Sequence, residues 1–329
     1  MGRHHARVRL HLAPPAPRRG RADGAGGPDR LSAWLAGQWR LLDSAPMRIG
    51  FAGAGLMGSH MVRNLLAAGH EIVVSSRNPH RLADTGWTVV DSPAKAAEGV
   101  DVVCCIVPDS PEVEAVVTSV LETAQPGAVI VEMSTISPGT ARRLADQAAK
   151  AGVDYLDCPV SGGPVGAEAG NLAIWVGGSP DAMERARPAL EAIGDPAKLM
   201  HCGDVGAGLV VKLANNYLGA VGAAASAEAL AMARAAGVDP ALVVKAVGGG
   251  TGANWQLANL MPRKVLAGDF EAGFKIAHMA KDLRIAAEVA DALGVEAPVL
   301  DLARARFEEA RDRYGDDVDY SEVARLAGW

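Results

Sequence analysis

The chain has 329 residues, and 49% of them are hydrophobic, so it can bury a sizeable core in one large or two medium-sized domains. Its formal net charge of −6 argues against sequence-independent binding to nucleic acid, which requires a basic surface. No apolar run reaches the roughly eighteen residues that a membrane span needs, so neither a nucleic acid nor a membrane is an expected partner.

Residues 1–46 differ from the rest of the sequence. They hold eight arginines against three aspartates, contain several prolines and show no sustained periodicity. We interpret this stretch as a disordered extension, or as the product of a translation start placed too far upstream, because Met47 is followed at once by an apolar strand pattern. An Arg-rich, acid-poor composition is also found in organellar transit peptides, but the prolines make this alternative the weaker one.

From Met47 onward, short apolar runs alternate with helical patterns. Each run is continuous rather than alternating, which is typical of strands that are buried on both faces of a parallel sheet. The strands are predicted at Arg48–Gly53, Glu71–Ser75, Thr88–Val90, Asp101–Val107, Ala128–Met133 and Val153–Asp157. Helices are predicted at Leu56–Ala68, after an N-cap at Ser110, and from Ser137-Pro138. This alternation predicts an α/β fold, a Rossmann-type doubly wound parallel sheet over residues 47–207.

The second half of the chain has a different pattern. From Gly206 to the C-terminus no strand is predicted, and Gly208–Ala236 reads as one long Ala-rich helix. Further helices are predicted at Pro240–Val247, Trp255–Leu266, Lys275–Leu293 and Pro298–Tyr314. The sequence therefore predicts a long interdomain helix that leads into an all-α domain over residues 208–329.

A glycine-rich motif follows the first predicted strand and opens the first helix. It has the G-x-G-x-x-G spacing, with the residues Gly53, Ala54, Gly55, Leu56, Met57 and Gly58. Such a turn lets a dinucleotide pyrophosphate approach the backbone at a helix N-terminus. The alternative is a glycine-rich turn without a ligand, but the strand–turn–helix context favours cofactor binding.

The end of the second predicted strand bears on the choice between NAD and NADP. NAD enzymes usually place Asp or Glu there to bind the ribose hydroxyls, whereas this strand ends in Ser75-Ser76-Arg77-Asn78. Arg77 can form paired hydrogen bonds to a 2′-phosphate, although it could equally be a solvated surface charge. We expect NADP(H) as the preferred cofactor, with NAD(H) possible.

Two segments carry candidate chemistry. Lys212 and Asn216 lie four residues apart on one helix face among apolar neighbours, and burial of a lysine lowers its pKa toward the range useful for proton exchange. Ser161, Gly162 and Gly163 follow a strand and could hold a carboxylate with their exposed amides. Taken alone, the first segment could be a snorkelling lysine, and the second an ordinary turn.

Lys281 and Asp282 are adjacent in a predicted helix, where a surface ion pair is the plain alternative. The four cysteines have no metal-ligand spacing, so no metal site and no disulfide are expected. Cys104 and Cys105 fall in an apolar strand pattern and are expected to be buried. Cysteines without disulfide bonds are typical of proteins in the reducing cytoplasm, where we expect this protein.

Together these segments resemble the β-hydroxyacid dehydrogenase family, which includes 3-hydroxyisobutyrate dehydrogenase, tartronate semialdehyde reductase and glyoxylate/succinic semialdehyde reductases. The resemblance extends from about Met47 to about Leu326. It rests on five stretches: GFAGAGLMG, EMSTISP, DCPVSGGPVGAEAGNLAIWVGG, GAGLVVKLANN and MAKDL. Their combination is far more specific than any one of them alone.

The resemblance implies a role for each segment. Lys212 matches the family's general acid/base, while Ser161, Gly162 and Gly163 match its substrate-carboxylate loop and Asn216 its substrate-orienting residue. Several further residues match its cofactor contacts: Val107, Pro108, Ser134, Thr135, Lys281, and Arg77 in the NADP-using members. Asp282 matches a supporting residue.

The implied reaction is NADP-linked oxidation of a small hydroxy acid, and its reversal. The substrate itself is left open, because Asn254 and Trp255 could line the pocket or fill the core. A homodimer or homotetramer is the expected assembly. One alternative is an imine reductase, which usually lacks a lysine at the position of Lys212, and another is a non-catalytic NADP-binding protein.

Overall fold

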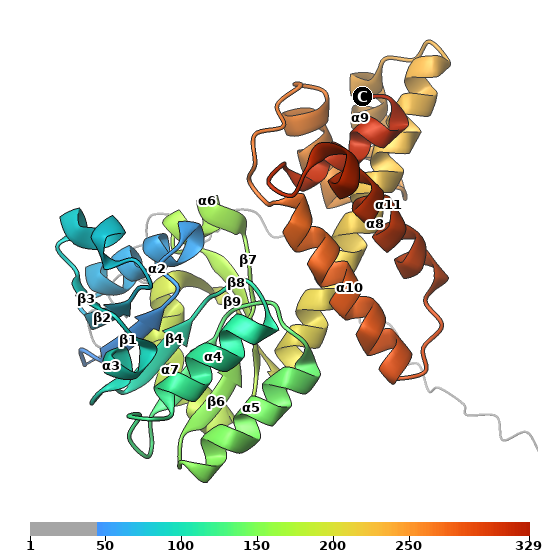
Figure 1. Ribbon diagram of the computed structural model, residues 1–329. Helices are drawn as coiled ribbons and strands as arrows, with labels where there is room; N and C mark the ends of the chain where they lie inside the picture. The colour runs from blue at the N-terminus through green and yellow to red at the C-terminus, as the bar shows by residue number, and fades with distance from the viewer. Residues whose placement is uncertain (1–44) are drawn as a thin grey trace, which may run out of the picture. The chain divides into compact units, whose positions relative to one another are not determined.

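The computed structural model describes residues 45–329, so the expectations for residues 1–46 lie almost wholly outside the described residues. The described chain contains one mixed sheet in the order β3-β2-β1-β4-β5-β6-β8-β7, with β9 paired to β8 (Figure 1). The strands are β1 (Arg48–Ala52), β2 (Glu71–Ser75), β3 (Thr88–Val90), β4 (Val102–Cys105), β5 (Val129–Glu132), β6 (Asp154–Asp157), β7 (Val160–Ser161), β8 (Leu172–Gly177) and β9 (Gly194–Gly203).

Strands β1 to β6 are all parallel, and their order is that of a doubly wound dinucleotide-binding sheet. Strand β8 runs antiparallel to β6 and β7, and β9 runs parallel to β8. The predicted Rossmann fold is therefore confirmed, with an antiparallel addition at one edge. The first five parallel strands begin and end within two residues of the sequence predictions, and β6 begins one residue later.

Helices cover both faces of the sheet. One face packs against α2 (Leu56–Ala67), α6 (Gly163–Glu168) and α7 (Pro180–Ile193), and the other against α3 (Pro93–Ala97), α4 (Ser110–Val120) and α5 (Pro138–Lys150). A 3-10 helix, η1 (Pro79–Thr85), links β2 to β3. Successive strand residues alternate between two cores: Val102 and Cys104 join one, and Val103 joins the other. This two-sided burial explains why the strand patterns are continuous.

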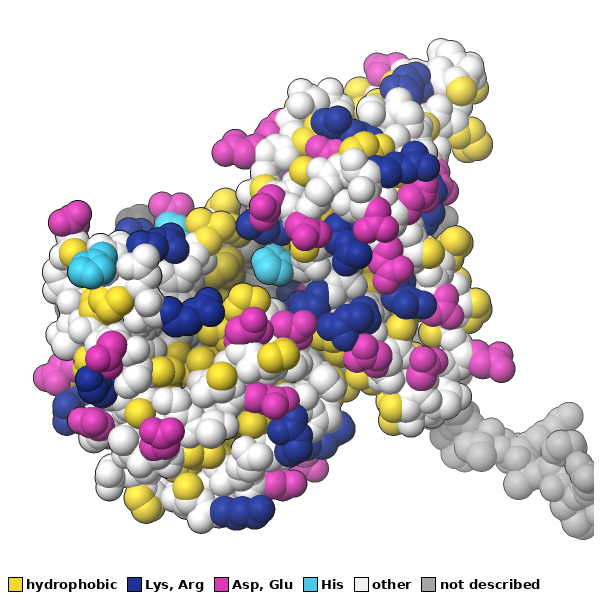
Figure 2. Space-filling model, viewed as in Figure 1, with side chains coloured by type: hydrophobic (Ala, Val, Ile, Leu, Met, Phe, Trp, Pro, Cys, Tyr) yellow, Lys and Arg dark blue, Asp and Glu magenta, His cyan; other side chains and the backbone are white. Residues whose placement is uncertain are grey.

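After the sheet the chain is helical. The elements are α8 (Ala207–Ala235), α9 (Pro240–Val247), η2 (Gln256–Val265), α10 (Ile276–Ala292), α11 (Pro298–Tyr314) and η3 (Tyr320–Ala327). They share a third core, in which Leu230, Leu260, Leu283 and Phe307 are buried. Figure 2 shows basic and acidic side chains interspersed over α10 and α11, where ion pairs such as Arg284–Glu288 lie on one helix.

Two helix predictions need correction. Trp255–Leu266 was expected to be an α-helix, but η2 is a π-helix in which the N–H of Leu266 bonds to the carbonyl of Met261. Pro262 lies inside it and cannot donate an α-helical bond, which favours the wider turn. At the start of α4 the N-cap is Asp109 rather than Ser110, since the Asp109 carboxylate accepts the N–H of Ser110.

Strands β7, β8 and β9 were not predicted. Strand β7 has only two residues, which is too short to give a pattern. Strand β9 is half-exposed and begins Gly-Asp-Pro, so its sequence lacks the continuous apolar run of a buried strand. None of the helices in residues 45–329 is long and apolar enough to cross a membrane.

Candidate active site

The turn between β1 and α2 is shaped for close backbone packing. Gly53 has φ +103°, and a Cβ there would lie 2.0 Å from the carbonyl oxygen of Ile106, while one at Gly58 would lie 2.1 Å from that of Gly53. A Cβ at Gly55 would meet nothing within 4 Å, and no side chain caps the N-terminus of α2. Ala54 and Met57 pack toward the core, and Leu56 is exposed. The first-turn N–H groups of α2 therefore face an open surface that fits an anion.

The segment after β2 carries no carboxylate. Ser75 is buried and its hydroxyl lies 3.5 Å from the carbonyl oxygen of Phe51, while the N–H of Asn78 donates to the hydroxyl of Ser76. Arg77 is exposed and forms no ion pair within the described residues. Its guanidinium is thus available to a ligand at the edge of the sheet.

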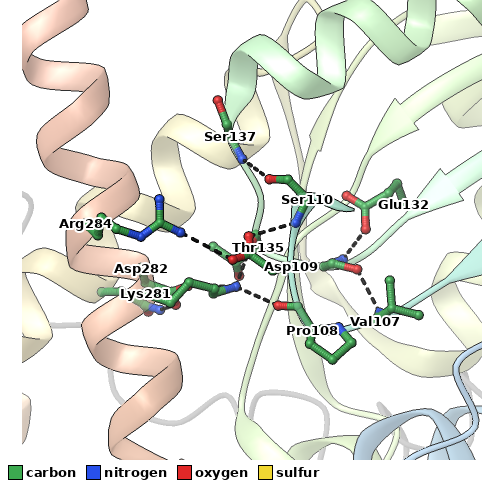
Figure 3. Close-up of polar contacts among 12 residues, drawn as sticks. Val107, Pro108, Asp109, Ser110, Glu132, Thr135, Ser137, Lys281, Asp282 and Arg284 are labelled. Carbon is green, nitrogen blue, oxygen red and sulfur yellow. Dashed lines mark hydrogen bonds and ion pairs between the residues drawn. The ribbon is translucent and has the colours of Figure 1, made fainter. Parts of the chain in front are cut away.

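The ends of β4 and β5 are joined by a short hydrogen-bond chain (Figure 3). The N–H of Val107 donates to the Ser134 hydroxyl at 2.9 Å, and the N–H of Ser134 donates to Oε1 of Glu132 at 2.6 Å. Glu132 is fully buried, and burial raises its pKa to about 8. This chain fixes the two strand ends where dinucleotides bind in sheets of this order.

Lys281 connects α10 to both of these strand ends. Its Nζ donates to the carbonyl oxygens of Pro108 at 3.0 Å and Thr135 at 2.5 Å, and lies 3.2 Å from Oδ1 of Asp282 (Figure 3). One turn further along, Arg284 lies 3.3 Å from the Asp109 carboxylate. Four of the predicted cofactor residues, Val107, Pro108, Thr135 and Lys281, therefore meet at one place.

Lys212 and Asn216 are buried in α8, with 7% and 6% of their surface exposed. Burial lowers the pKa of Lys212; the nearby Asp282 carboxylate opposes this shift and Lys281 adds to it. The amide Nδ2 of Asn216 donates to Oδ2 of Asp282, and its carbonyl Oδ1 accepts a bond from Asn215. Because Asp282 binds Asn216 and lies beside Lys281, it links the two helices at the site.

The loop Ser161–Gly163, which is predicted to bind the substrate carboxylate, lies at the edge of the sheet. Ser161 ends β7 and is half-buried opposite Ala173 of β8, and Gly162 and Gly163 both have positive φ. Within residues 45–329 no hydrogen bond or ion pair joins this loop, or Arg77, to Lys212. Direct contacts thus join Lys281 to Pro108 and Thr135, and Asp282 to Asn216, which shares α8 with Lys212. The glycine-rich turn, Arg77 and the loop are separate parts of the candidate site.

Two buried acids were not singled out from the sequence. Glu132 stands directly opposite Asp157 in the parallel register of β5 and β6, and neither side chain reaches solvent. The Asp157 carboxylate accepts the N–H groups of Gly206 at 2.6 Å and Leu209 at 2.9 Å, and burial raises its pKa to about 6. An acid at the end of an apolar strand was the available sequence signal.

Comparisons with known proteins cover most of the described chain. A family model described as the NAD binding domain of 6-phosphogluconate dehydrogenase matches residues 48–206. A second, described as the NAD-binding of NADP-dependent 3-hydroxyisobutyrate dehydrogenase, matches residues 206–327. The two matches meet at residue 206, immediately before α8 begins.

Individual relatives agree with these family models. The chain is 36% identical to a 3-hydroxyisobutyrate dehydrogenase of Pseudomonas aeruginosa, over 84% of this chain and 97% of that protein. It is 36% identical to the 2-hydroxy-3-oxopropionate reductase of Escherichia coli, over 85% of this chain and 96% of that protein. The solved Mycobacterium tuberculosis 3-hydroxyisobutyrate dehydrogenase with L-serine is 34% identical with a TM-score of 0.81, covering 87% of this chain and 100% of that chain.

Proposed function

The chain belongs to the β-hydroxyacid dehydrogenase family and is an NAD(P)-dependent dehydrogenase that acts on CH–OH groups. From this premise we propose that it interconverts a small β-hydroxy acid and its semialdehyde or keto acid. In this proposal Lys212 is the general acid/base. The observation that carries this proposal is the buried amine of Lys212, on the helix face it shares with Asn216 and beside Asp282.

Lys212 would move the proton of the reaction. Burial favours its neutral amine, and a neutral amine can take the hydroxyl proton of the alcohol during oxidation. During reduction the same side chain, as an ammonium, would return that proton to the carbonyl oxygen. When bound, the nicotinamide accepts or donates the hydride.

The substrate would be held at both of its ends. The hydroxyl of Ser161 and the amides of Gly162 and Gly163 would bind the carboxylate, since consecutive glycine amides form an anion-binding turn. Asn216 would orient the reacting hydroxyl: its amide nitrogen donates one N–H to Asp282 and its carbonyl oxygen accepts one bond from Asn215, which leaves a second donor and a second acceptor position on the amide. Trp255 is 57% exposed, which leaves it available to line a pocket rather than fill the core.

The nicotinamide cofactor would occupy the carboxyl ends of the parallel strands. The turn from Gly53 to Gly58 fits the pyrophosphate, Ser134 and Thr135 the ribose side, and Val107 and Pro108 the end of β4. Exposed Arg77 and Asn78, with no carboxylate beside them, support a preference for NADP(H), with NAD(H) as the weaker cofactor.

We also propose a homodimer or homotetramer in the cytoplasm. Leu218 and Met232 are 68% and 72% exposed and lie fourteen residues apart on one face of α8, and α9 beside it buries none of its side chains. A second copy of the chain would cover this apolar face. Four cysteines without a disulfide support a reducing compartment.

The decisive experiment is the substitution Lys212→Ala, assayed with NADPH and NADH over a panel of small semialdehydes, hydroxy acids and cyclic imines. We expect the wild type to turn over hydroxy acids and the variant to lose at least about 100-fold in kcat, the usual contribution of a general acid/base. NADPH affinity, measured by fluorescence, should change little. Turnover that survives in the variant, or a wild type that reduces only imines, would reject the proposal.

A further inference from the structure

The N-terminus of α8 is held by a side chain from the sheet. Both carboxylate oxygens of Asp157 accept backbone N–H groups there, one from Gly206 and one from Leu209, and the carboxylate is fully buried. These N–H groups have no partner within a helix, so a carboxylate that accepts two of them satisfies the helix end and its positive dipole. Lys212 lies only one turn beyond Leu209.

The packing at this point leaves no space for a side chain at Gly208. A Cβ at Gly208 would lie 2.3 Å from the carbonyl oxygen of Trp175 and 2.9 Å from Oδ2 of Asp157. The glycine therefore lets α8 press its first turn against β8 and the end of β6. These contacts with β8 and the end of β6 hold the first turn of α8 in place, and with it the position of Lys212 one turn further along the helix.

The same strands carry the substrate-carboxylate loop. Asp157 ends β6 four residues before Ser161, and Ser161 pairs with Ala173 of β8, two residues before Trp175. The carboxylate and the close approach at Gly208 thus connect the helix that bears the amine to β6 and β8, beside which the loop lies. In the described part of the chain, no hydrogen bond joins Ser161–Gly163 directly to α8.

We propose that Asp157 is a positioning residue for catalysis, which fixes the distance between the amine of Lys212 and the anion-binding loop Ser161–Gly163. The proposal rests on the function proposed above. In this role Asp157 makes no contact with substrate. Its carboxylate acts by holding α8, and with it Lys212, in position. A shift of about 1 Å in a reacting group can reduce turnover by about 100-fold, so a residue in this place affects kcat more than binding.

The charged and titratable groups around Asp157 come from several elements. They are Glu132 on β5, Tyr155 on β6, Cys158 directly after β6, Arg142 on α5 and Cys202 on β9. Among these side chains, within the described residues, that of Asp157 alone accepts N–H groups at the N-terminus of α8. The substitution Asp157→Asn turns one of the two carboxylate oxygens into an NH₂ group. This group faces the N–H of Gly206 or of Leu209, so one of the two hydrogen bonds is replaced by a repulsive contact between donors.

The test compares kcat, KM and cofactor affinity in Asp157→Asn and Gly208→Ala with those of the wild type, below the melting transition of each protein. We expect both variants to lose about 10- to 100-fold in kcat, while KM for the hydroxy acid and Kd for NADPH stay within about threefold. Gly208→Ala displaces the same contact without changing a charge, so it decides the question if Asp157→Asn does not fold.

Asp319→Asn is the matched control. Asp319 is also a buried aspartate whose carboxylate accepts backbone N–H groups, those of Gly273, Phe274 and Ser321, but it lies among the helices. The substitution Asp319→Asn should lower the melting temperature and leave kcat unchanged. An equal loss of kcat in this control, or an unchanged kcat in Asp157→Asn and Gly208→Ala, overturns the proposal. Lys212→Ala is assayed in parallel: if it stays active, the proposed function fails too; if it is inactive, only the role of Asp157 fails.

Discussion

At the scale of single residues, the site depends on acids that are kept from water. Glu132 and Asp157 are cross-strand neighbours, both are fully buried, and burial raises the pKa of each. Two adjacent carboxyl groups in such surroundings cannot both ionise readily. Since Asp157 accepts two N–H groups and Glu132 accepts one, the proton is expected on Glu132 at neutral pH.

The pKa of Glu132 predicts how stability depends on pH. Its value in the folded protein, about 8, is above the ordinary 4.5, so the folded chain binds this proton more tightly than the unfolded chain. The resulting stabilisation is present below about pH 4.5 and is lost as the pH rises to about 8, with a size of a few kcal/mol at most.

We therefore expect the melting temperature of the wild type to fall by several degrees more than that of Glu132→Gln between pH 5 and pH 8. Glutamine keeps the acceptor for the N–H of Ser134 and cannot ionise. Scanning calorimetry in matched buffers measures the two curves. Parallel curves would show that Glu132 does not hold its proton as we infer.

Arg77 carries the prediction about cofactor choice. Replacing it with Asp removes a charge-assisted partner of a 2′-phosphate and introduces the carboxylate that NAD-using sheets have at this place. The ratio of kcat/KM for NADPH to that for NADH should fall by at least about tenfold. Arg63→Asp, an equal charge change at an exposed position of α2, is the control and should leave the ratio unchanged. A ratio that falls equally in both variants would mean a general charge effect.

At the scale of elements, the sequence predicts best where local chemistry sets the boundary. The ranges of α9 and α11 match their predictions because each starts with proline and is followed by glycine. Strands β2 and β3 match as well. The π-helix η2 could not be predicted, since its wide turn depends on how Pro262 is accommodated by packing against α8.

The antiparallel edge of the sheet shows a different limit. The run LAIWVG of β8 has the pattern of a buried strand, but its antiparallel place beside β6 and β7 depends on long-range pairings that the pattern does not encode. The site has the same limit. Spacing puts Lys212 and Asn216 on one helix face. The bonds that Asn216 donates to Asp282 and Gly206 donates to Asp157 join residues 66 and 49 positions apart, which spacing cannot predict.

At the scale of the whole molecule, the assembly is the main open prediction. Leu218 and Met232 form the exposed apolar face of α8 that we assign to a second copy. Substituting both with Glu should convert the wild-type oligomer to a monomer, because two buried charges without partners are costly. Sedimentation velocity measures this. Val165→Glu changes another exposed apolar residue, 78% accessible on α6, and should leave the mass unchanged. A monomeric wild type would contradict the proposed assembly.

Because glycine has no side chain, Gly208 limits which sequence changes this protein can accept in evolution. A side chain there would collide with the carbonyl of Trp175, so any replacement has to shift the first turn of α8 away from the sheet. Trp255, by contrast, lies exposed and can be exchanged without disturbing that junction. On the proposed function, in which Trp255 lines the substrate pocket, new substrate preferences can arise by changing this residue while the position of Lys212 is retained.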